Sequence, residues 1–135
     1  MIDATMKHKS IPKLSSHDKK IIDVFYELGM PKNLAKTLMY VSHVKECRSS
    51  DIEKGADLRQ PEVSVAMQEL TDLGWISKRN KKKEGKGRPI YIYQFDSTID
   101  NIMEHMEKKK LNEIETIKED LKELKQLLKN VEKQA

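Results

Sequence analysis

The feature that most constrains the fold of this chain is the pair Pro61 and Gly74, which enclose a periodic segment and precede a run of β-branched and aromatic residues. Proline has a helical φ and lacks an N–H, so it suits the first turn of a helix, whereas glycine readily adopts the left-handed conformation that ends one. We therefore expect a helix from about Gln60 to the residue before Gly74. Its apolar residues recur at three- and four-residue intervals and form one stripe: Val63, Ala66, Met67, Leu70 and Leu73.

A shorter helix is expected just before this one, at about residues 51–56. Ser50 stands three positions before Glu53, which is the spacing of a capping box, so Ser50 is the predicted N-cap of this helix. Only residues 57–59 separate the two segments, and two helices joined by so short a connection predict a helix-turn-helix.

Two strands are expected after Gly74, at residues 75–79 and 90–95, because both segments are rich in β-branched and aromatic residues. The connection between them contains Gly85, Gly87 and Pro89, so the strands should form a hairpin with a long tip. This hairpin contains one acidic residue, Glu84, and seven basic residues: Lys78, Arg79, Lys81, Lys82, Lys83, Lys86 and Arg88. So many like charges repel one another in the free protein, and their expected partner is a polyanion.

The strings LRQPEVSVAMQELTDLGWI and GRPIYIY, in this order of elements, resemble the winged helix-turn-helix domain of prokaryotic transcription regulators. The resemblance is closest to the archaeal TrmB-like and the MarR/ArsR-like groups, and it covers about residues 28–95. It implies that LGMPKNLAKTLMY forms the preceding helix and that the helix starting near Gln60 lies in the major groove of DNA. Many relatives have a basic residue after the serine of this helix. This chain has Val65 there, whose side chain can contact a thymine methyl group.

This interpretation assigns DNA contacts to two sets of residues. Base contacts are expected from the helix starting near Gln60, where arginine suits guanine and glutamine suits adenine: Arg59, Gln60, Ser64, Val65 and Gln68. Backbone contacts are expected from the start of the preceding helix and from the hairpin: Ser49, Ser50, Lys78, Arg79, Lys81, Lys82, Lys83, Lys86 and Arg88.

Composition favours a small domain with a solvated extension, because only 37% of the 135 residues are hydrophobic while 36% are charged. The net charge of +4 is concentrated before Thr98, where 18 basic residues face 13 acidic ones. The single cysteine excludes an intramolecular disulfide and favours a reducing compartment. Because the chain also lacks a signal peptide and an apolar run of the roughly 18 to 20 residues that span a bilayer, we expect a cytoplasmic, nucleoid-associated protein with no membrane partner.

The chain before the helix-turn-helix is expected to form a flexible arm, residues 1–14, and two helices. Pro12 and the absence of a period favour the arm, and the few basic residues Lys7, Lys9 and Lys13 do not require a minor-groove role for it. Ser15, Ser16 and Asp18 are candidate N-cap residues for the first helix, which Gly29 ends, and Pro31 opens the second. Both helices should serve as the packing surface for the helix-turn-helix.

A single long helix is expected from Thr98 to the C-terminus, because this segment contains neither glycine nor proline. Its apolar residues form a heptad seam that predicts a coiled coil. Lys110 breaks the register of this seam around residues 108–111, where the helix is expected either to kink or to exchange partners. Such a stripe cannot be buried within one isolated helix, so self-association into a homodimer is preferred to folding back on the domain. The predicted dimer interface consists of Ile99, Met103, Met106, Ile114, Ile117, Leu121, Leu124, Leu128 and Val131.

The chain lacks recognisable enzyme motifs: it has no phosphate loop with its lysine, no HExxH, no serine elbow and no set of zinc-spaced cysteines. His43 and Cys47 are four residues apart and could share a metal, but two ligands do not make a site. We therefore expect neither catalysis nor a cofactor.

The sequence thus predicts a mainly α protein with a small β-hairpin: a winged helix-turn-helix domain at residues 15–97 and a C-terminal dimerisation helix at residues 98–135. The expected function is that of a homodimeric, sequence-specific regulator of transcription on double-stranded DNA. Two alternatives stay open, a winged-helix adaptor between proteins of the transcription machinery and an architectural nucleoid protein. The operator, the sign of regulation and any small-molecule effector are not specified by the sequence.

Overall fold

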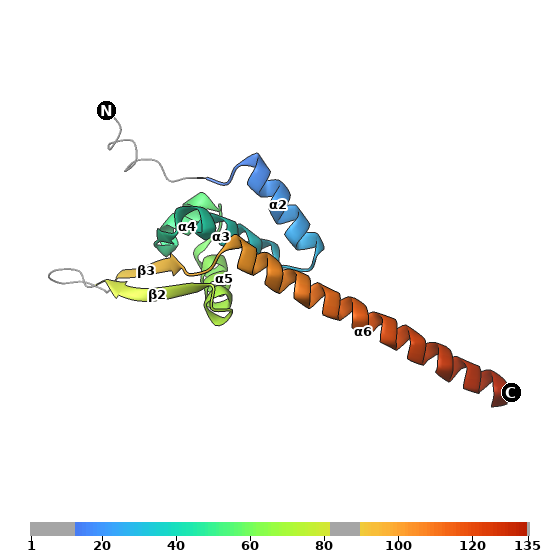
Figure 1. The fold of residues 1–135 in the computed structure, drawn as a ribbon. Coiled ribbons are helices and arrows are strands. Elements are labelled where there is room, and N and C mark those ends of the chain that lie inside the picture. The colour runs from blue at the N-terminus through green and yellow to red at the C-terminus, as the bar shows by residue number, and fades with distance from the viewer. Residues whose placement is uncertain (1–12, 82–89, 135) are drawn as a thin grey trace. The chain divides into compact units, whose positions relative to one another are not determined.

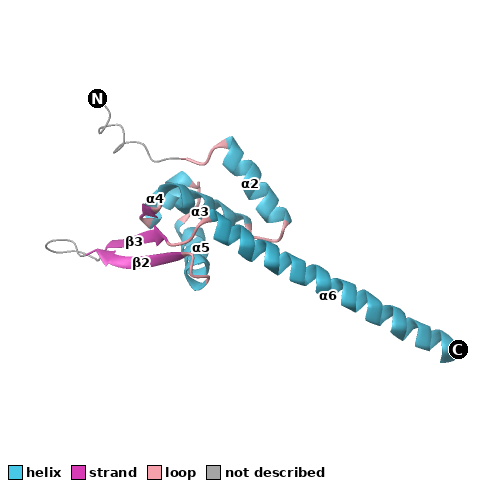
Figure 2. Ribbon diagram, in the orientation of Figure 1, coloured by secondary structure: helices cyan, strands magenta, loops and turns pink. Residues whose placement is uncertain are grey.

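The computed structural model describes residues 13–81 and 90–134, and most of the expected N-terminal arm, residues 1–14, lies outside this range. Figure 1 shows the order of the elements along the chain, and Figure 2 shows that helices predominate. The elements are α2 (Ser16–Glu27), α3 (Lys32–Val44), β1 (Glu46–Cys47), α4 (Ser49–Gly55), α5 (Gln60–Asp72), β2 (Ile76–Lys81), β3 (Ile90–Phe95) and α6 (Ile99–Gln134). The chain divides into two compact units after Thr98, so α6 forms a unit of its own.

Helix α2 begins with a capping box. Ser15 is the N-cap; its hydroxyl accepts a hydrogen bond from the Asp18 amide (3.1 Å), and its own amide donates to Asp18 Oδ2 (2.9 Å). Asp18 Oδ1 also lies 2.8 Å from His43 Nε2 on α3. One buried carboxylate therefore both starts α2 and ties it to α3.

The helix-turn-helix consists of α4 and α5, which pack on α3. The prediction that Ser50 caps α4 was wrong: the helix begins at Ser49, its N-cap is Arg48, and Asp51 Oδ2 accepts the Arg48 N–H at 3.0 Å. Asp51 can do so because it lies three residues after Arg48, which is the same spacing that made Ser50 and Glu53 look like a cap.

The turn between α4 and α5 contains Asp57 in the left-handed region, with φ of 56°. Aspartate tolerates this conformation better than most residues do. The turn is further closed by a hydrogen bond from the Leu58 amide to the Glu53 carbonyl (2.9 Å). Gln60 begins α5 as expected, and Gly74, with φ of 80°, follows its end.

The sheet has three antiparallel strands in the order β1-β3-β2, so the expectation of a two-stranded ribbon was incomplete. The predicted hairpin is present, with Ile76 opposite Phe95 and Lys81 opposite Ile90. The additional strand, β1, pairs Cys47 with Tyr93. A two-residue strand is too short to produce an alternating pattern in the sequence.

The core of the first unit is built from one side of each helix and the base of the sheet. Its buried residues include Ile22 and Phe25 of α2, Leu34, Leu38 and Val41 of α3, Ile52 of α4, Val63, Met67 and Leu70 of α5, and Ile76 and Phe95 of the sheet. Val24 of α2 and Leu28, the C-cap residue of this helix, are exposed.

Helix α6 is continuous from Ile99 to Gln134, so the kink predicted near residues 108–111 does not interrupt it. Lys110 leaves the apolar stripe and pairs with Glu113 at 3.0 Å. From Leu111 onward every residue of the helix is exposed. None of the helices in the described part of the chain combines the length and the apolar character needed to cross a lipid bilayer.

Gly55 is the position where a single methyl group should be most disruptive. A Cβ built there would lie 2.7 Å from Cζ of the Tyr40 ring and closer still to Cε1 and Cδ1. Because Tyr40 is itself buried, its ring cannot simply move away. We expect Gly55→Ala to lower the free energy of unfolding by about 1–3 kcal/mol, the usual cost of overpacking. Urea unfolding followed by circular dichroism would measure it, with the exposed neighbour Lys54→Ala as control; a variant as stable as the control would contradict this packing.

Because of Asp18, the free energy of unfolding should depend on pH in the acid range. Burial raises the pKa of its carboxyl, but hydrogen bonds from the Ser15 amide, the His43 ring and the Ser15 hydroxyl outweigh burial, and the pKa is lowered overall. A lowered pKa in the folded state means that this stability is present above the unfolded pKa of about 3.9 and is lost as the pH falls through the folded value.

We therefore expect Asp18→Asn to be less stable than the wild type by about 1 kcal/mol near pH 7, with the gap closing in acid below pH 4. Unfolding curves between pH 7 and pH 2.5 would measure this, and Asp23→Asn, which changes an exposed carboxylate on the same helix, is the matched control. A gap that stays constant over the whole range would show that the Asp18 charge does not support the fold.

Candidate nucleic-acid interface

Helix α5 has one side in the core and one side in solvent. Val63, Ala66, Met67 and Leu70 are buried, each at 3% exposure or less. The residues between them, Ser64, Val65 and Gln68, are exposed, and Val65 is exposed at 69%. Because the buried stripe fixes the rotation of the helix, these three side chains point outward together.

The N-terminal end of α5 is held by Glu62. Its Oε1 accepts the Arg59 amide at 2.8 Å, and its Oε2 lies 3.4 Å from Asn33 Nδ2 on α3. The bond from the Arg59 amide is the main cause of a lowered pKa at Glu62. Nε of Arg59 lies 3.8 Å from Glu62 Oε1, and the guanidinium group remains exposed to solvent. Arg59 and Gln60 are therefore both exposed to solvent at the start of the helix.

The C-terminal half of the outer face is acidic. Gln68 donates from Nε2 to Asp72 Oδ1 at 3.0 Å, and Glu69 and Asp72 lie beside it on the exposed surface. The carbonyl oxygen of Gln68 takes no part in this bond. The helix thus presents a cation at its start and carboxylates at its end.

The β-hairpin carries exposed basic residues on the described part of β2. Lys78 Nζ lies 4.6 Å from the centre of the Tyr91 ring, and Arg79 forms an ion pair with Glu46 of β1. Both contacts fix these side chains on the sheet rather than at its tip. The tip residues Lys82, Lys83, Lys86 and Arg88 lie outside the described residues, as does the side chain of Lys81.

The predicted backbone-contact serines lie on the first turn of α4, Ser49 half-buried and Ser50 exposed. The described members of the two predicted sets belong to one compact unit, which contains α4, α5 and both strands of the hairpin.

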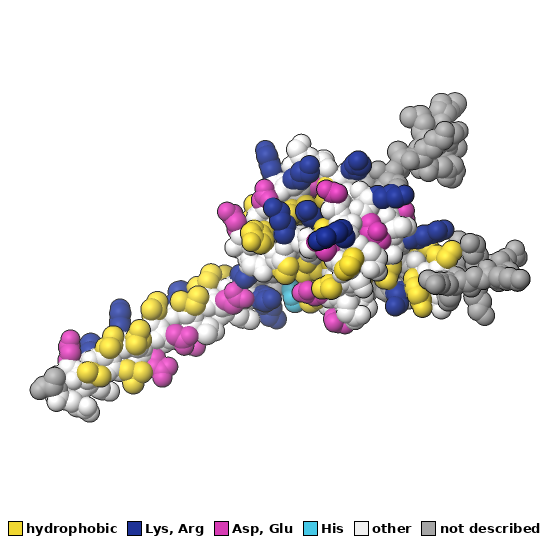
Figure 3. Space-filling model, turned by 180° about the vertical axis from the view of Figure 1, so that it is seen from behind, with side chains coloured by type: hydrophobic (Ala, Val, Ile, Leu, Met, Phe, Trp, Pro, Cys, Tyr) yellow, Lys and Arg dark blue, Asp and Glu magenta, His cyan; other side chains and the backbone are white. Residues whose placement is uncertain are grey.

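Helix α6 carries the other predicted set. Eight of the nine residues predicted for the dimer interface are exposed at 48–62%. The ninth, Met106, is buried. Leu111 and Leu127 are also exposed at 55% and 54%, and the sequence prediction did not include them. Figure 3 shows apolar side chains following one another along the helix. The seam is thus an exposed apolar face on the single chain.

His43 and Cys47 do not face a common ligand. The His43 ring is bound to Asp18, and Cys47 is buried, with burial raising the pKa of its thiol to about 12. A thiol with so high a pKa is a poor nucleophile and a poor metal ligand near pH 7. Among the described residues, no three His, Cys, Asp or Glu side chains come together as a metal site would require.

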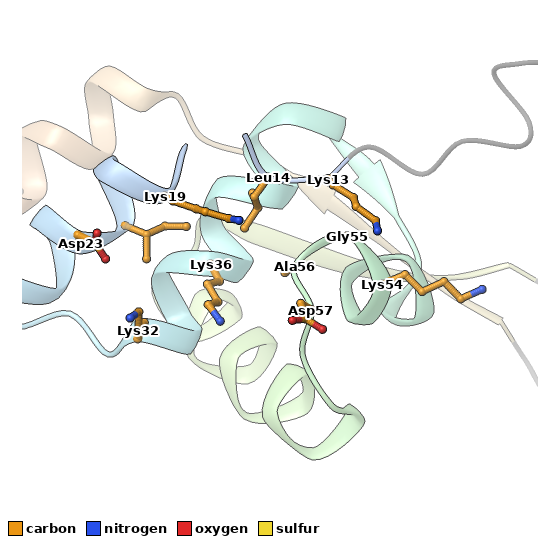
Figure 4. Close-up of a pocket in the computed structure, with 11 residues that line it drawn as sticks. Lys13, Leu14, Lys19, Asp23, Lys32, Lys36, Lys54, Gly55, Ala56 and Asp57 are labelled. Carbon is orange, nitrogen blue, oxygen red and sulfur yellow. The ribbon is translucent and has the colours of Figure 1, made fainter. Parts of the chain in front are cut away.

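A group of lysines that the sequence prediction did not single out lines a cavity between α2, α3 and the α4–α5 turn (Figure 4). These lysines come from separate segments, and each alone looks like an ordinary surface charge. No local pattern in the sequence could have brought them together.

Comparison with known proteins supports the fold. No protein-family model and no curated protein matches the chain. Among solved structures, a possible transcriptional regulator from Methanosarcina mazei Go1 is similar to it at a TM-score of 0.58 and 16% identity, covering 80% of this chain and 86% of that one. The fold is that of winged-helix regulators, mainly helical with a small three-stranded sheet and a long C-terminal helix.

Two further structures were found with lower scores. A transcriptional regulator homologue from Pyrococcus horikoshii OT3 has a TM-score of 0.44 at 20% identity, covering 78% of this chain and 97% of that one. The MarR family regulator NMB1585 from Neisseria meningitidis has a TM-score of 0.44 at 15% identity, covering 89% and 94%. Both are described as transcriptional regulators or homologues of one, and NMB1585 as a member of the MarR family. These structures do not confirm the archaeal TrmB-like subtype.

Proposed function

We propose that this chain is a sequence-specific regulator of transcription that binds double-stranded DNA as a homodimer. The observation that carries the proposal is the outward presentation of Ser64, Val65 and Gln68 by a helix whose opposite side is buried. An α-helix fits the major groove, which is about 12 Å wide, so exposed side chains on such a helix can reach base edges.

The charges along α5 suggest how far the helix enters the groove. Arg59 at its start can approach guanine or a phosphate, whereas Glu69 and Asp72 near its end repel phosphates. The part of α5 that reads bases therefore extends from Arg59 to Gln68, ahead of these two carboxylates. Val65 suits a thymine methyl group, and the free carbonyl oxygen of Gln68 suits the amino group of adenine or cytosine.

The basic hairpin supplies the contacts that do not depend on sequence. Lys78 and Arg79 are exposed on β2, and the sequence adds five more basic residues before β3. Each phosphate that a cation neutralises releases counterions from DNA, so the hairpin adds affinity for any duplex. Ser49 and Ser50 at the start of α4 are further proposed donors to the DNA backbone.

The apolar face of α6 supports a homodimer. A lone helix with this much exposed apolar surface gains little stability, and a second copy offers a matching face. Two copies related by a two-fold axis would present two α5 helices to a palindromic site. A protein adaptor is the second candidate, because the same face could equally bind another protein.

The matched pair Gln68→Ala and Gln126→Ala tests base reading. Gln68 lies on the outer face of α5 and Gln126 on α6, and both are exposed. With duplexes selected by the wild-type protein from a random pool, Gln68→Ala should weaken the preference over unselected duplex by about 1–3 kcal/mol, while Gln126→Ala should not change it. Fluorescence anisotropy at two salt concentrations would measure both affinities.

In the same titrations, Lys82→Ala with Lys83→Ala should weaken binding to all duplexes alike and should lower the salt dependence, because two phosphate contacts are lost. If the wild type binds no duplex, or binds with no dependence on salt, the adaptor becomes the better proposal. If the wild type binds duplexes but selects no sequence, the architectural nucleoid protein becomes the better proposal.

The double variant Leu121→Ala with Leu124→Ala tests the dimer. Each leucine is more than half exposed on the single chain, and burying a leucine in an interface core contributes about 2–5 kcal/mol relative to alanine. We expect the wild type to elute with twice the 15.7 kDa chain mass in light-scattering chromatography, and the variant to be monomeric at micromolar concentration. Lys122→Ala with Lys125→Ala changes the neighbouring surface and should remain dimeric; a monomeric wild type would refute self-association.

A further inference from the structure

A cavity of about 620 Å³ opens between the first halves of α2 and α3 and the turn that joins α4 to α5. Figure 4 shows the residues that line it, which come from four separate parts of the first unit. The volume is within the range of small-molecule sites. It lies away from the outer face of α5, because neither Ser64, Val65 nor Gln68 lines it.

The rim of the cavity is strongly basic. Five lysines line it, against the two carboxylates of Asp23 and Asp57: Lys13, Lys19, Lys32, Lys36 and Lys54. Within the part of the chain that the structure describes, none of the five forms an ion pair, although other lysines of this chain do. The five positive charges outnumber the two carboxylates, so they repel one another on balance, and an anion placed among them reduces that repulsion.

The floor of the cavity is apolar. Ile22 and Ala56 are each exposed at only 2%, and Gly55, which also lines it, is buried against Tyr40. Lys36, which also lines the cavity, is only partly exposed. A ligand that fits both surfaces has a charged part for the lysines and an apolar part for the floor.

From this arrangement we propose that the cavity binds a small organic anion of the phosphate-ester class, a molecule with at least two negative charges on an apolar body. Lysine ammonium groups bind phosphate oxygens through charge-assisted hydrogen bonds, and their flexible stems let several converge on one group. A phosphate of duplex DNA carries a single charge on a continuous backbone, so it suits an exposed ridge such as the hairpin better than a recess with an apolar floor.

One wall of the cavity is formed by Gly55 at the end of α4 and by Ala56 and Asp57 of the turn that joins α4 to α5. A ligand that contacts this turn would touch the segment that sets the start of the proposed recognition helix. If the chain binds DNA as proposed, a small molecule bound in this cavity would therefore modulate DNA binding.

Isothermal titration of the full-length protein with phenyl phosphate, in the absence of DNA, tests the site itself. We expect one saturable site per chain and no binding of phenol, the uncharged counterpart. The double variant Lys19→Gln with Lys36→Gln keeps the aliphatic stems but removes two charges, and it should raise the dissociation constant at least about tenfold, as expected from losing a charge-assisted hydrogen bond. Lys20→Gln with Lys122→Gln removes the same charge outside the cavity and should bind as the wild type does.

Thermal melts of all three proteins would confirm that the variants are folded. Absence of saturable binding of phenyl phosphate by the folded wild type, or an equal loss in both double variants, would overturn the proposal. If only duplex affinity falls in the Lys19 and Lys36 variant while phenyl phosphate does not bind, the lysines contact DNA and the small-anion site is refuted. Because the titration contains no DNA, a failure of the proposed regulator function would leave its result unaffected.

Discussion

The packing of the apolar stripe of α5 against the core is the interaction on which the rest of the candidate interface depends. Val63, Ala66, Met67 and Leu70 are nearly inaccessible, and the helix also contacts α3, α4 and β2. Because that side is buried, the rotation of α5 about its axis is fixed. The side chains of Ser64, Val65 and Gln68 therefore point into solvent. Glu62 adds a polar restraint at the start of the helix by joining Arg59 to Asn33. The chemistry of the outer face is thus a consequence of the core beneath it.

Much of this arrangement could be predicted from the sequence because its signals are local. Pro61 and Gly74 delimit α5, the three- and four-residue spacing of apolar residues identifies its buried side, and the β-branched segments identify the hairpin. The features that were missed depend on residues far apart in the chain. Strand β1 needs β3 to exist, and the lysine-lined cavity gathers Lys19, Lys36 and Lys54 from three helices. The Arg48–Asp51 cap was missed because two overlapping segments had the same spacing and the local pattern could not rank them.

Helix α6 shows the same limit in another form. Its heptad pattern predicts a helix with an apolar seam, and the exposed residues of the single chain agree with that pattern. A seven-residue period indicates that the apolar face packs against another helix. The same pattern fits a helix of a second copy and a helix of another protein. Charge does not decide the matter either, because Lys110–Glu113 and Lys118–Glu115 are satisfied within the helix. The homodimer is therefore proposed from the self-complementarity of the face.

The proposed function requires α5 and the basic hairpin to form one surface that fits a DNA duplex. Hydroxyl-radical footprinting, combined with methylation interference on a selected duplex, locates the contacts on the DNA. We expect interference at guanine N7 in one major groove per half-site, where α5 would lie, with protected sugars on the flanking backbone, where the hairpin would lie. Protection without any base interference, or interference confined to the minor groove, would contradict it.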